Sequence, residues 1–226
     1  MHPSLNPSLD TLAPATAAVF TRDCRACPRL AAFLEAGRVK HPDYYCRPVA
    51  AFGAQQPRLL IVGLAPGFHG ANKTGRPFTG DHAGILLYET LHAFGFADKP
   101  VSVAADDGLQ LIGCRITNAV KCVPPENKPE TAEIVRCNAY LQHELASLTA
   151  NSAVLALGQI AHAAVLRAVG VKAKDYPFAH AARHDLPGEL RLYDSYHCSR
   201  YNTQTRRLTP EMFRAVFTRI TTDQES

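Results

Sequence analysis

The sequence predicts an α/β fold in which helices cover both faces of a parallel sheet. Four short runs are rich in β-forming residues, and two of them are almost wholly apolar, as expected of strands buried on both faces. Helical patterns lie between or after these runs. Because strands that alternate with helices form parallel sheets with crossover connections, we expect three layers, α/β/α.

The expected strands are spread along the chain at residues 58–63, 115–120, 152–158 and 190–195. The first and third are the apolar runs, RLLIVG and SAVLALG. The expected helices cover about residues 83–94, 129–148, 159–169 and 210–221. Two of these helices open with a proline, whose fixed φ and missing N–H suit the first helical position.

Composition indicates a soluble globular protein. The 226 residues suit one domain over 1–226, with residues 1–20 as a loosely held N-terminal segment. The chain is 46% hydrophobic and 19% charged, which excludes an intrinsically disordered protein. No apolar run approaches the roughly 20 residues of a membrane span, and the first residues lack a secretory signal pattern, so we expect a cytoplasmic protein. The net charge of +4 suits nucleic acid but also many metabolic enzymes.

The seven cysteines are read as metal ligands, reactive thiols or buried apolar thiols, since a disulfide scaffold does not suit a reducing cytoplasm. Cys24 and Cys27 form a C-x2-C pair, and Cys122 and Cys137 form a second pair. Two such pairs can supply four thiolates to one site, with zinc as suitable as iron on spacing alone. The other three have no ligand spacing and are read as ordinary buried thiols: Cys46, Cys114 and Cys198.

A glycine-rich loop, LAPGFHGANKTGRPFTGD at residues 64–81, follows the first expected strand. Ligands of open parallel sheets bind outside the carboxyl ends of the strands, and a loop this long is usually functional. The loop contains neither the Walker A nor the dinucleotide-binding glycine pattern, which argues against nucleotide cofactors. Its last residue, Asp81, has two readings that do not exclude each other: cap of the next helix, or catalytic acid.

Two more polar side chains stand at expected strand ends. Asn118 lies in an otherwise apolar strand end, where a buried amide must find hydrogen-bond partners in the protein or in a ligand. His197 follows the last strand in YHCSRYN and could donate a proton or a hydrogen bond to a ligand. Both residue types are also common as purely structural hydrogen-bonding groups.

Together these segments resemble the uracil-DNA glycosylase superfamily, and most closely its iron–sulfur-containing type b (family 5) branch. The resemblance rests on GLAPGFHGANKTGRPFTGD (63–81), TNAVKCVPPENKPET (117–131) and YHCSRYNTQTRRLTP (196–210), with support from CRACPRL (24–30) and RPVAAFG (47–53). It implies a three-layer α/β/α sandwich around a central four-stranded parallel sheet. It also implies a hydrolase that excises uracil from DNA and leaves an abasic site.

The resemblance assigns roles to particular residues. It implies a [4Fe–4S] cluster on Cys24, Cys27, Cys122 and Cys137. It implies that Phe78 stacks on the flipped base, that Asn118 reads the uracil edge and that His197 contacts uracil O2. The predicted catalytic residues are Asp81, His197 and Asn72. The predicted substrate-binding residues are Gly63, Ala65, Gly67, His69, Phe78, Asn118, Ser199 and Arg200.

This chain departs from better-known branches, because Leu64 stands where the related thermophilic iron–sulfur branch has an acidic residue. Asp81 is then the nearest acidic candidate, and Leu64 suggests tolerance for other deaminated bases such as hypoxanthine or xanthine. The expected partner is DNA, single- or double-stranded, bound by a monomer without membrane contact. The cations expected to meet phosphates are Lys73, Arg76, Lys121, Arg200, Arg206 and Arg207.

Two other functions compete with this prediction. One is a non-catalytic nucleic-acid-binding module with a structural metal, which would keep the cysteines but would lack the set of His197, Phe78 and Asn118. The other is a hydrolase that uses Cys198 as nucleophile beside His197. Adjacent residues at a strand end point in opposite directions, so that pair is poorly placed for proton transfer.

Overall fold

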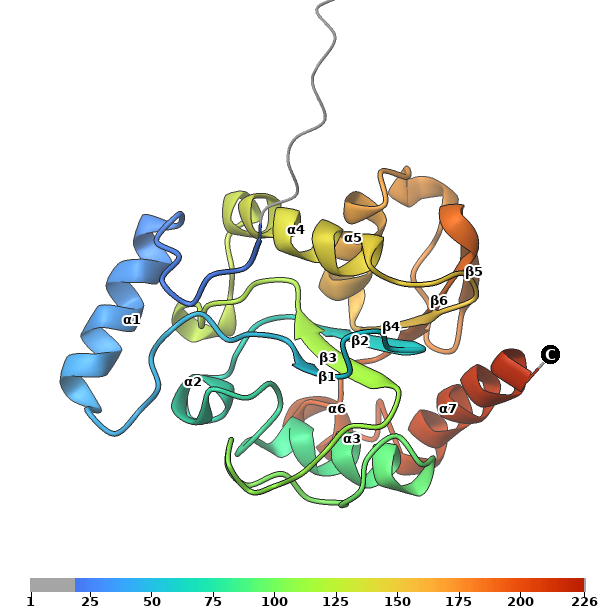
Figure 1. Ribbon diagram of the computed structural model, residues 1–226, viewed down its shortest axis with the longest axis horizontal. Helices are drawn as coiled ribbons and strands as arrows, with labels where there is room; N and C mark the ends of the chain where they lie inside the picture. The colour runs from blue at the N-terminus through green and yellow to red at the C-terminus, as the bar shows by residue number, and fades with distance from the viewer. Residues whose placement is uncertain (1–18, 226) are drawn as a thin grey trace, which may run out of the picture.

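The computed structural model describes residues 19–225, which fold around a six-stranded sheet (Figure 1). The strands are β1 (Phe52–Gly53), β2 (Leu59–Gly63), β3 (Cys114–Asn118), β4 (Ala153–Leu157), β5 (Arg183–Leu186) and β6 (Leu190–Ser195). They lie in the order β1-β3-β2-β4-β6-β5. The four inner strands pair in parallel, and each outer strand pairs antiparallel with its neighbour.

The sheet is larger than the four-stranded parallel sheet expected from the sequence, because both edges were missed. The expected strands correspond to the inner four, β2, β3, β4 and β6. The edge strand β1 has only two residues, and β5 reads RHDL with a single apolar side chain. Neither offers the apolar or alternating pattern from which a strand is predicted, since backbone hydrogen bonds to one neighbour hold an edge strand.

Within residues 19–225, seven α-helices surround the sheet. They are α1 (Pro28–Lys40), α2 (Ala71–Thr74), α3 (His82–Ala93), α4 (Thr131–Ala146), α5 (Gln159–Ala168), α6 (Arg200–Gln204) and α7 (Pro210–Glu225). The described residues also contain three short 3₁₀ helices: η1 (Pro125–Asn127), η2 (Ala173–Asp175) and η3 (Pro187–Glu189). The helices α3, α4, α5 and α7 match those expected, whereas α1, α2 and α6 were not predicted.

The two faces of the sheet form two separate cores. In β2, Leu59 and Ile61 pack on the face covered by α3 and α7, and Leu60 and Val62 pack on the face covered by α4 and α5 (Figure 1). Side chains alternate between faces along a strand, so an unbroken apolar run is required where both faces are covered. The alternation explains why the apolar runs of β2 and β4 were the most reliable strand signals.

A third apolar cluster attaches α1 to the end of the sheet. Leu30 and Leu34 of α1 pack against Val120 and Val123, which follow β3. The expected loose segment over residues 1–20 lies outside the described residues except for its last two, and there Phe20 makes an edge contact with the ring of Tyr140 at 5.6 Å between centroids. Within residues 19–225, no helix is long and apolar enough to cross a membrane.

Candidate active site

A cavity of about 420 Å³ opens at the carboxyl ends of β2, β3 and β6. Most of the substrate-binding and catalytic residues predicted from the sequence line it: Ala65, Gly67, Phe78, Asp81, Asn118, His197, Ser199 and Arg200. Leu64, which the sequence analysis linked to base tolerance, also lines it. The other lining residues were not singled out beforehand: Ala71, His82, Ala83 and Asn127. The glycine-rich loop, the end of β3 and the loop after β6 therefore meet at one place, as expected for a parallel sheet.

Gly63, the last residue of β2, makes room for two of these side chains. A Cβ added at this position would collide with the Asn118 amide oxygen and would lie 2.6 Å from Phe78 Cζ. Gly63 itself does not line the cavity. Its contribution is the close approach of Phe78 and Asn118 to the strand end, which any side chain would prevent.

Phe78 presents a buried aromatic ring at the cavity. Its backbone has φ of 53°, a left-handed conformation that costs a bulky residue free energy and persists only where surrounding contacts enforce it. One such contact is the Tyr88 hydroxyl, which donates to the Pro77 carbonyl at 2.9 Å. The Phe78 and His197 rings are nearly parallel, with centroids 5.9 Å apart. The loop thus holds a strained phenylalanine against the cavity wall.

Asn118 has an unsatisfied acceptor at the cavity. Its side chain is buried, and its Oδ1 has no hydrogen-bond partner among the described residues. A buried amide oxygen without a partner costs about 1–3 kcal/mol, so such groups commonly await a ligand. Asn118 could accept a hydrogen bond from an N–H group in the cavity.

His197 is a neutral imidazole in this setting. Burial lowers the pKa of His197 to about 4, so the ring is uncharged near pH 7. The Asn202 amide donates to the His197 carbonyl at 2.8 Å and fixes the backbone of the loop. A neutral imidazole still carries one N–H, which can donate to an acceptor in the cavity.

Asp81 is the N-cap of α3 and lines the cavity at the same time. Its Oδ1 accepts a hydrogen bond from the Gly84 N–H at 2.9 Å. Burial raises the pKa of the Asp81 carboxyl, and backbone hydrogen bonds from Gly84 and Ala83 partly oppose that shift. A Cβ added at Gly70 would lie 2.7 Å from Asp81 Oδ2, so this position accommodates the carboxylate only as glycine. The capping role expected of Asp81 is confirmed, and its catalytic role stays a prediction.

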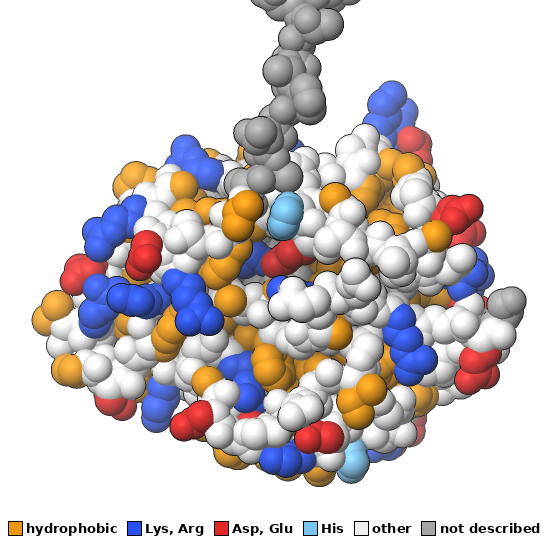
Figure 2. All heavy atoms as spheres, in the orientation of Figure 1, with side chains coloured by type: hydrophobic (Ala, Val, Ile, Leu, Met, Phe, Trp, Pro, Cys, Tyr) orange, Lys and Arg blue, Asp and Glu red, His pale blue; other side chains and the backbone are white. Residues whose placement is uncertain are grey.

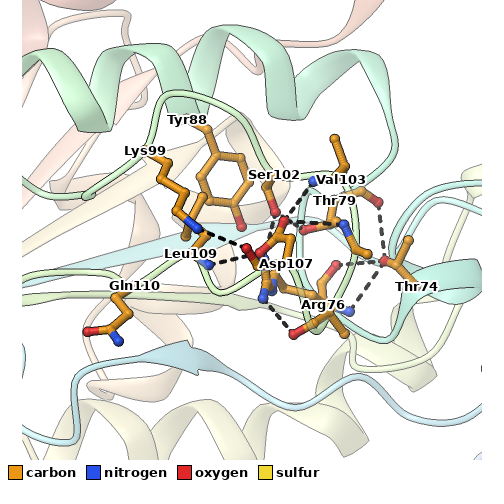
Figure 3. Close-up of polar contacts among 12 residues, drawn as sticks. Thr74, Arg76, Thr79, Tyr88, Lys99, Ser102, Val103, Asp107, Leu109 and Gln110 are labelled. Carbon is orange, nitrogen blue, oxygen red and sulfur yellow. Dashed lines mark hydrogen bonds and ion pairs between the residues drawn. The ribbon is translucent and has the colours of Figure 1, made fainter.

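A buried polar network holds the glycine-rich loop in place (Figure 3). We call it the Arg76–Asp107 node, after the ion pair at its centre. Arg76 donates to Asp107 Oδ1 at 2.7 Å, to the Ser102 hydroxyl at 3.0 Å and to the Ala105 carbonyl at 2.6 Å. Thr79, one residue after Phe78, shares a 2.7 Å hydrogen bond with Ser102. The node therefore joins the loop that carries Phe78 to the segment before β3.

Asp107 is the carboxylate at the centre of the node. It accepts from the N–H groups of Val103, Ala104 and Leu109 as well as from Arg76. Although burial acts in the opposite direction, these bonds hold the pKa of Asp107 well below its usual range. Asp107 is therefore charged, and its ion pair with Arg76 is largely shielded from solvent.

Two of the six cations expected to contact phosphates are unavailable for that role. Arg76 is only 4% exposed because it is bound to Asp107, and Lys121 is only 1% exposed because its ammonium contacts both Glu144 carboxylate oxygens at 2.8 and 2.9 Å. The sequence shows that these residues are basic but not that each has a distant acidic partner. The other four are exposed: Lys73, Arg200, Arg206 and Arg207.

Sequence reasoning also missed a basic surface beside α1. Figure 2 shows Lys and Arg side chains gathered at the left of the molecule, over α1. Four arginines line a small hollow there: Arg22, Arg25, Arg38 and Arg47. They are scattered over residues 22–47, so no local run of charge marks them.

Asn72 and His69 do not line the cavity. Asn72 is fully buried in α2, and its amide donates at 3.4 Å to the Phe68 carbonyl and to Cys46 Sγ. His69 is exposed and hydrogen-bonded to the Tyr44 hydroxyl at 2.8 Å. Asn72 thus contacts the loop backbone at Phe68, whereas His69 joins the loop to the Tyr44 side chain. The catalytic and binding roles predicted for these residues stay predictions.

The four cysteines with ligand spacing surround a separate cavity of about 200 Å³. Cys24 and Cys27 precede α1, Cys122 follows β3 and Cys137 lies in α4. Burial raises the pKa of Cys137 to about 11, and it raises that of Cys122 further. Such thiols stay protonated unless a metal takes the place of the proton.

The remaining cysteines behave as buried apolar groups. Cys198 is fully buried, and burial raises its pKa far above the usual value, so it is not an activated nucleophile. Cys46 and Cys114 are also buried. None of the seven cysteines forms a disulfide within residues 19–225.

Comparison with known proteins finds relatives over most of the chain. The profile of the Uracil DNA glycosylase superfamily matches residues 50–221, which include all six strands. A type-5 uracil-DNA glycosylase of Thermus thermophilus is 48% identical over 198 residues, covering 85% of this chain and 90% of the relative. A type-5 uracil-DNA glycosylase of Pyrobaculum aerophilum is 40% identical over 205 residues, covering 89% of each. A type-4 uracil-DNA glycosylase of Sulfurisphaera tokodaii is 28% identical over 175 residues, covering 73% and 70%.

Proposed function

The chain belongs to the uracil DNA glycosylase superfamily, and from that premise we propose that it removes uracil from DNA. The reaction is hydrolysis of the N-glycosidic bond, which leaves an abasic site. The observation that carries the proposal is the cavity at the strand ends, where an aromatic ring, an unpaired amide oxygen, a neutral imidazole and a carboxylate meet. A non-catalytic binding module would not need this combination.

Phe78 and Asn118 would bind the base after it leaves the duplex stack. Extruding a base costs a few kcal/mol, which stacking and edge hydrogen bonds recover in the pocket. The Phe78 ring offers a face for stacking, and Asn118 Oδ1 offers an acceptor for an N–H on the base edge. Uracil carries such an N–H between its two carbonyl groups, so the unpaired oxygen of Asn118 suits it.

His197 would stabilise the departing base. Cleavage of the glycosidic bond builds negative charge on the base and positive charge on the sugar. Because its pKa is lowered to about 4 by burial, His197 would donate a hydrogen bond to uracil O2 as a neutral imidazole and would not transfer a full proton. A donor of this kind typically contributes about 10²–10³ in rate.

Asp81 would orient the attacking water or stabilise the sugar cation. Its Oδ1 is committed to the helix cap, and Oδ2 lies near Gly67 on the cavity wall. Asn72 and His69 would act from outside the cavity by holding the loop, Asn72 through the Phe68 carbonyl and His69 through the Tyr44 hydroxyl. Exposed Arg200, with Ser199, would meet the DNA backbone at the cavity rim.

We propose that Cys24, Cys27, Cys122 and Cys137 hold a [4Fe–4S] cluster. Four thiols suit this cluster, and their cavity of about 200 Å³ suits a group larger than a single ion. Ligand sulfurs of one zinc would lie about 3.8 Å apart. Among the described residues, the only group of three or more His, Cys, Asp or Glu side chains whose ligand atoms lie within 4.8 Å of one another is a different one, with no cysteine. The cluster would supply structural bonds between α1, β3 and α4.

Two measurements on the purified protein test these proposals. A labelled oligonucleotide with one uracil should yield an alkali-labile site, and the same sequence with thymine should not. Anaerobically prepared protein should be brown and contain about four irons per chain, and Cys122→Ala should lose both. An inert protein would contradict the glycosylase proposal, whereas stoichiometric zinc without iron would contradict only the cluster.

We propose that the chain acts as one domain and as a monomer on single- or double-stranded DNA. We also propose a cytoplasmic location, where cysteines stay reduced, because none of the described cysteines forms a disulfide. Leu64 on the cavity wall supports tolerance for other deaminated bases such as hypoxanthine, which the same assay can compare directly.

A further inference from the structure

His162, His184 and Asp194 form a buried cluster at the far edge of the sheet from β1. His162 lies in α5, His184 in β5 and Asp194 in β6. His184 pairs with Leu192 in the β5–β6 ladder, which places it on the same face as Asp194, the face covered by α5. The exposed side-chain fractions are 4% for His162, 13% for His184 and 0% for Asp194. Neither the glycosylase cavity nor the cysteine cavity includes any of them.

The three side chains direct their ligand atoms at one another. His162 Nδ1 lies 2.8 Å from Asp194 Oδ1, and His184 Nε2 lies 3.4 Å from Asp194 Oδ2. Each residue offers one atom to a set in which all atoms lie within 4.8 Å of one another. Two imidazole nitrogens and one carboxylate oxygen are the ligands that zinc and its neighbours prefer, and not those of calcium or magnesium.

Two of these atoms lack a hydrogen bond in the protein. His184 Nε2 and Asp194 Oδ2 are both buried, and neither has a hydrogen-bond partner among the described residues, although they face each other. A carboxylate with no exposed surface needs a positive partner, because an isolated buried charge is very costly. The unsatisfied nitrogen and oxygen point to a cation between them.

His162 is oriented as metal-bound histidines usually are. Its Nε2 donates to the Tyr176 carbonyl at 2.9 Å, which leaves Nδ1 facing Asp194. Metal-ligating histidines commonly donate their second N–H to a carbonyl or carboxylate, which fixes the tautomer. The alternative is a doubly protonated His162, which would form an ion pair with Asp194 and leave His184 Nε2 without a partner.

From this geometry we propose that His162, His184 and Asp194 bind a divalent transition-metal ion, with Zn²⁺ as the best fit. Ligand atoms of a tetrahedral zinc with bonds of about 2.0 Å lie about 3.3 Å apart. Asp194 would bind through both carboxylate oxygens, because Oδ1 faces His162 and Oδ2 faces His184. The distance of 3.4 Å from His184 Nε2 to Oδ2 already matches, and the distance of 2.8 Å from His162 Nδ1 to Oδ1 must open by about half an ångström. A water molecule that enters beside the partly exposed His184 would occupy the remaining coordination position of the ion. The ion fastens α5 to β5 and β6.

The test loads the intact protein, with its iron, with Zn²⁺ and measures tightly held zinc after desalting. We expect one zinc per chain in the wild type and none in His184→Gln or Asp194→Asn. His143→Gln, which changes an exposed histidine of α4, should keep the zinc. At about 100 times the dissociation constant, Zn²⁺ should raise the unfolding midpoint by roughly 5–10 °C in the wild type and not in His184→Gln.

Two readouts keep the result specific. Co²⁺ at this site should give weak d–d absorption without a sulfur-to-metal band, whereas Co²⁺ bound by cysteines would show one. If Asp194→Asn does not fold, His184→Gln still decides, because it removes a nitrogen with no hydrogen bond to lose. A wild type that holds no zinc, or a His184→Gln variant that holds as much, would overturn the proposal and favour a doubly protonated His162.

Discussion

The candidate active site and the Arg76–Asp107 node are neighbours on one loop, yet they treat their polar groups in opposite ways. In the node, Arg76 and Asp107 satisfy each other and a set of backbone groups. In the cavity, Asn118 Oδ1 has no partner among the described residues, and His197 is kept neutral by burial. We infer from this difference that the node holds the glycine-rich loop in place. The polar groups in the cavity can therefore stay without protein partners and remain available to a ligand.

Breaking the node should have the largest effect on stability. Arg76→Met leaves the Asp107 carboxylate buried without its cation, which we expect to cost about 3–5 kcal/mol of unfolding free energy. Lys128→Met removes one partner of an exposed ion pair with Glu126 and should cost less than about 1 kcal/mol. Denaturant unfolding of both variants measures the difference, and equal small losses would show that the node does not hold the loop.

Acidification should remove the stability contributions of the two regions over different pH ranges. The pKa of His197 is about 4 when folded and about 6.5 when unfolded, so the unfolded chain binds more protons between these values. Stability should therefore fall as pH drops from 6.5 to 4, by at most about 3 kcal/mol from this group. The folded pKa of Asp107 is below its usual value, so its contribution is lost only below about pH 4.

The measurement is the unfolding free energy of the wild type and of His197→Gln between pH 7 and pH 4. The difference between the two proteins isolates His197 from other titrating groups. The wild type should lose more stability than the variant over this window. Parallel curves would mean that His197 is not buried as a neutral ring.

Asp81 combines a structural role with a place in the active site, because it caps α3 and also lines the cavity. Asp81→Asn should keep the cap, since asparagine caps nearly as well, but should slow single-turnover cleavage by about 10² if the charge orients water or stabilises the sugar. Asp81→Ala should lose about 1 kcal/mol of stability in addition. A stable and fully active Asp81→Asn would limit Asp81 to capping.

The smallest effect is expected in the salt dependence of DNA affinity. This dependence comes from the exposed cations, which have no part in the Arg76–Asp107 node. Arg200→Gln removes an exposed charge at the cavity rim and should flatten the slope of log K against log salt for duplex DNA by about 0.9. Arg47→Gln changes an exposed arginine of the surface beside α1 and should leave the slope unchanged. The opposite result would move the DNA contact to α1.

The sequence was most informative where one physical signal dominated. The apolar runs of β2 and β4 predicted buried strands because both faces of the sheet are covered. The polar residues placed at strand ends, Asn118 and His197, do meet at one cavity, since carboxyl ends of parallel strands share an edge. Periodicity and topology were sufficient for these features.

The sequence failed where the decisive partner is distant or only the backbone matters. Arg76 and Lys121 read as free cations because Asp107 and Glu144 are 31 and 23 residues away. The strand β5 escaped notice because RHDL carries no apolar pattern. Helix α1 begins with no side-chain hydrogen bond at its cap and buries few residues, so its pattern was weak.

The most direct test of the central claim is single-turnover cleavage of a uracil-containing oligonucleotide by the wild type and His197→Ala, with DNA affinity measured on the same samples. The wild type should cleave, and the variant should be about 10² slower or more while its affinity is nearly unchanged, because the lost hydrogen bond strengthens only as the base departs. Equal rates, or a slower variant that has simply lost DNA binding, would contradict this assignment of the cavity.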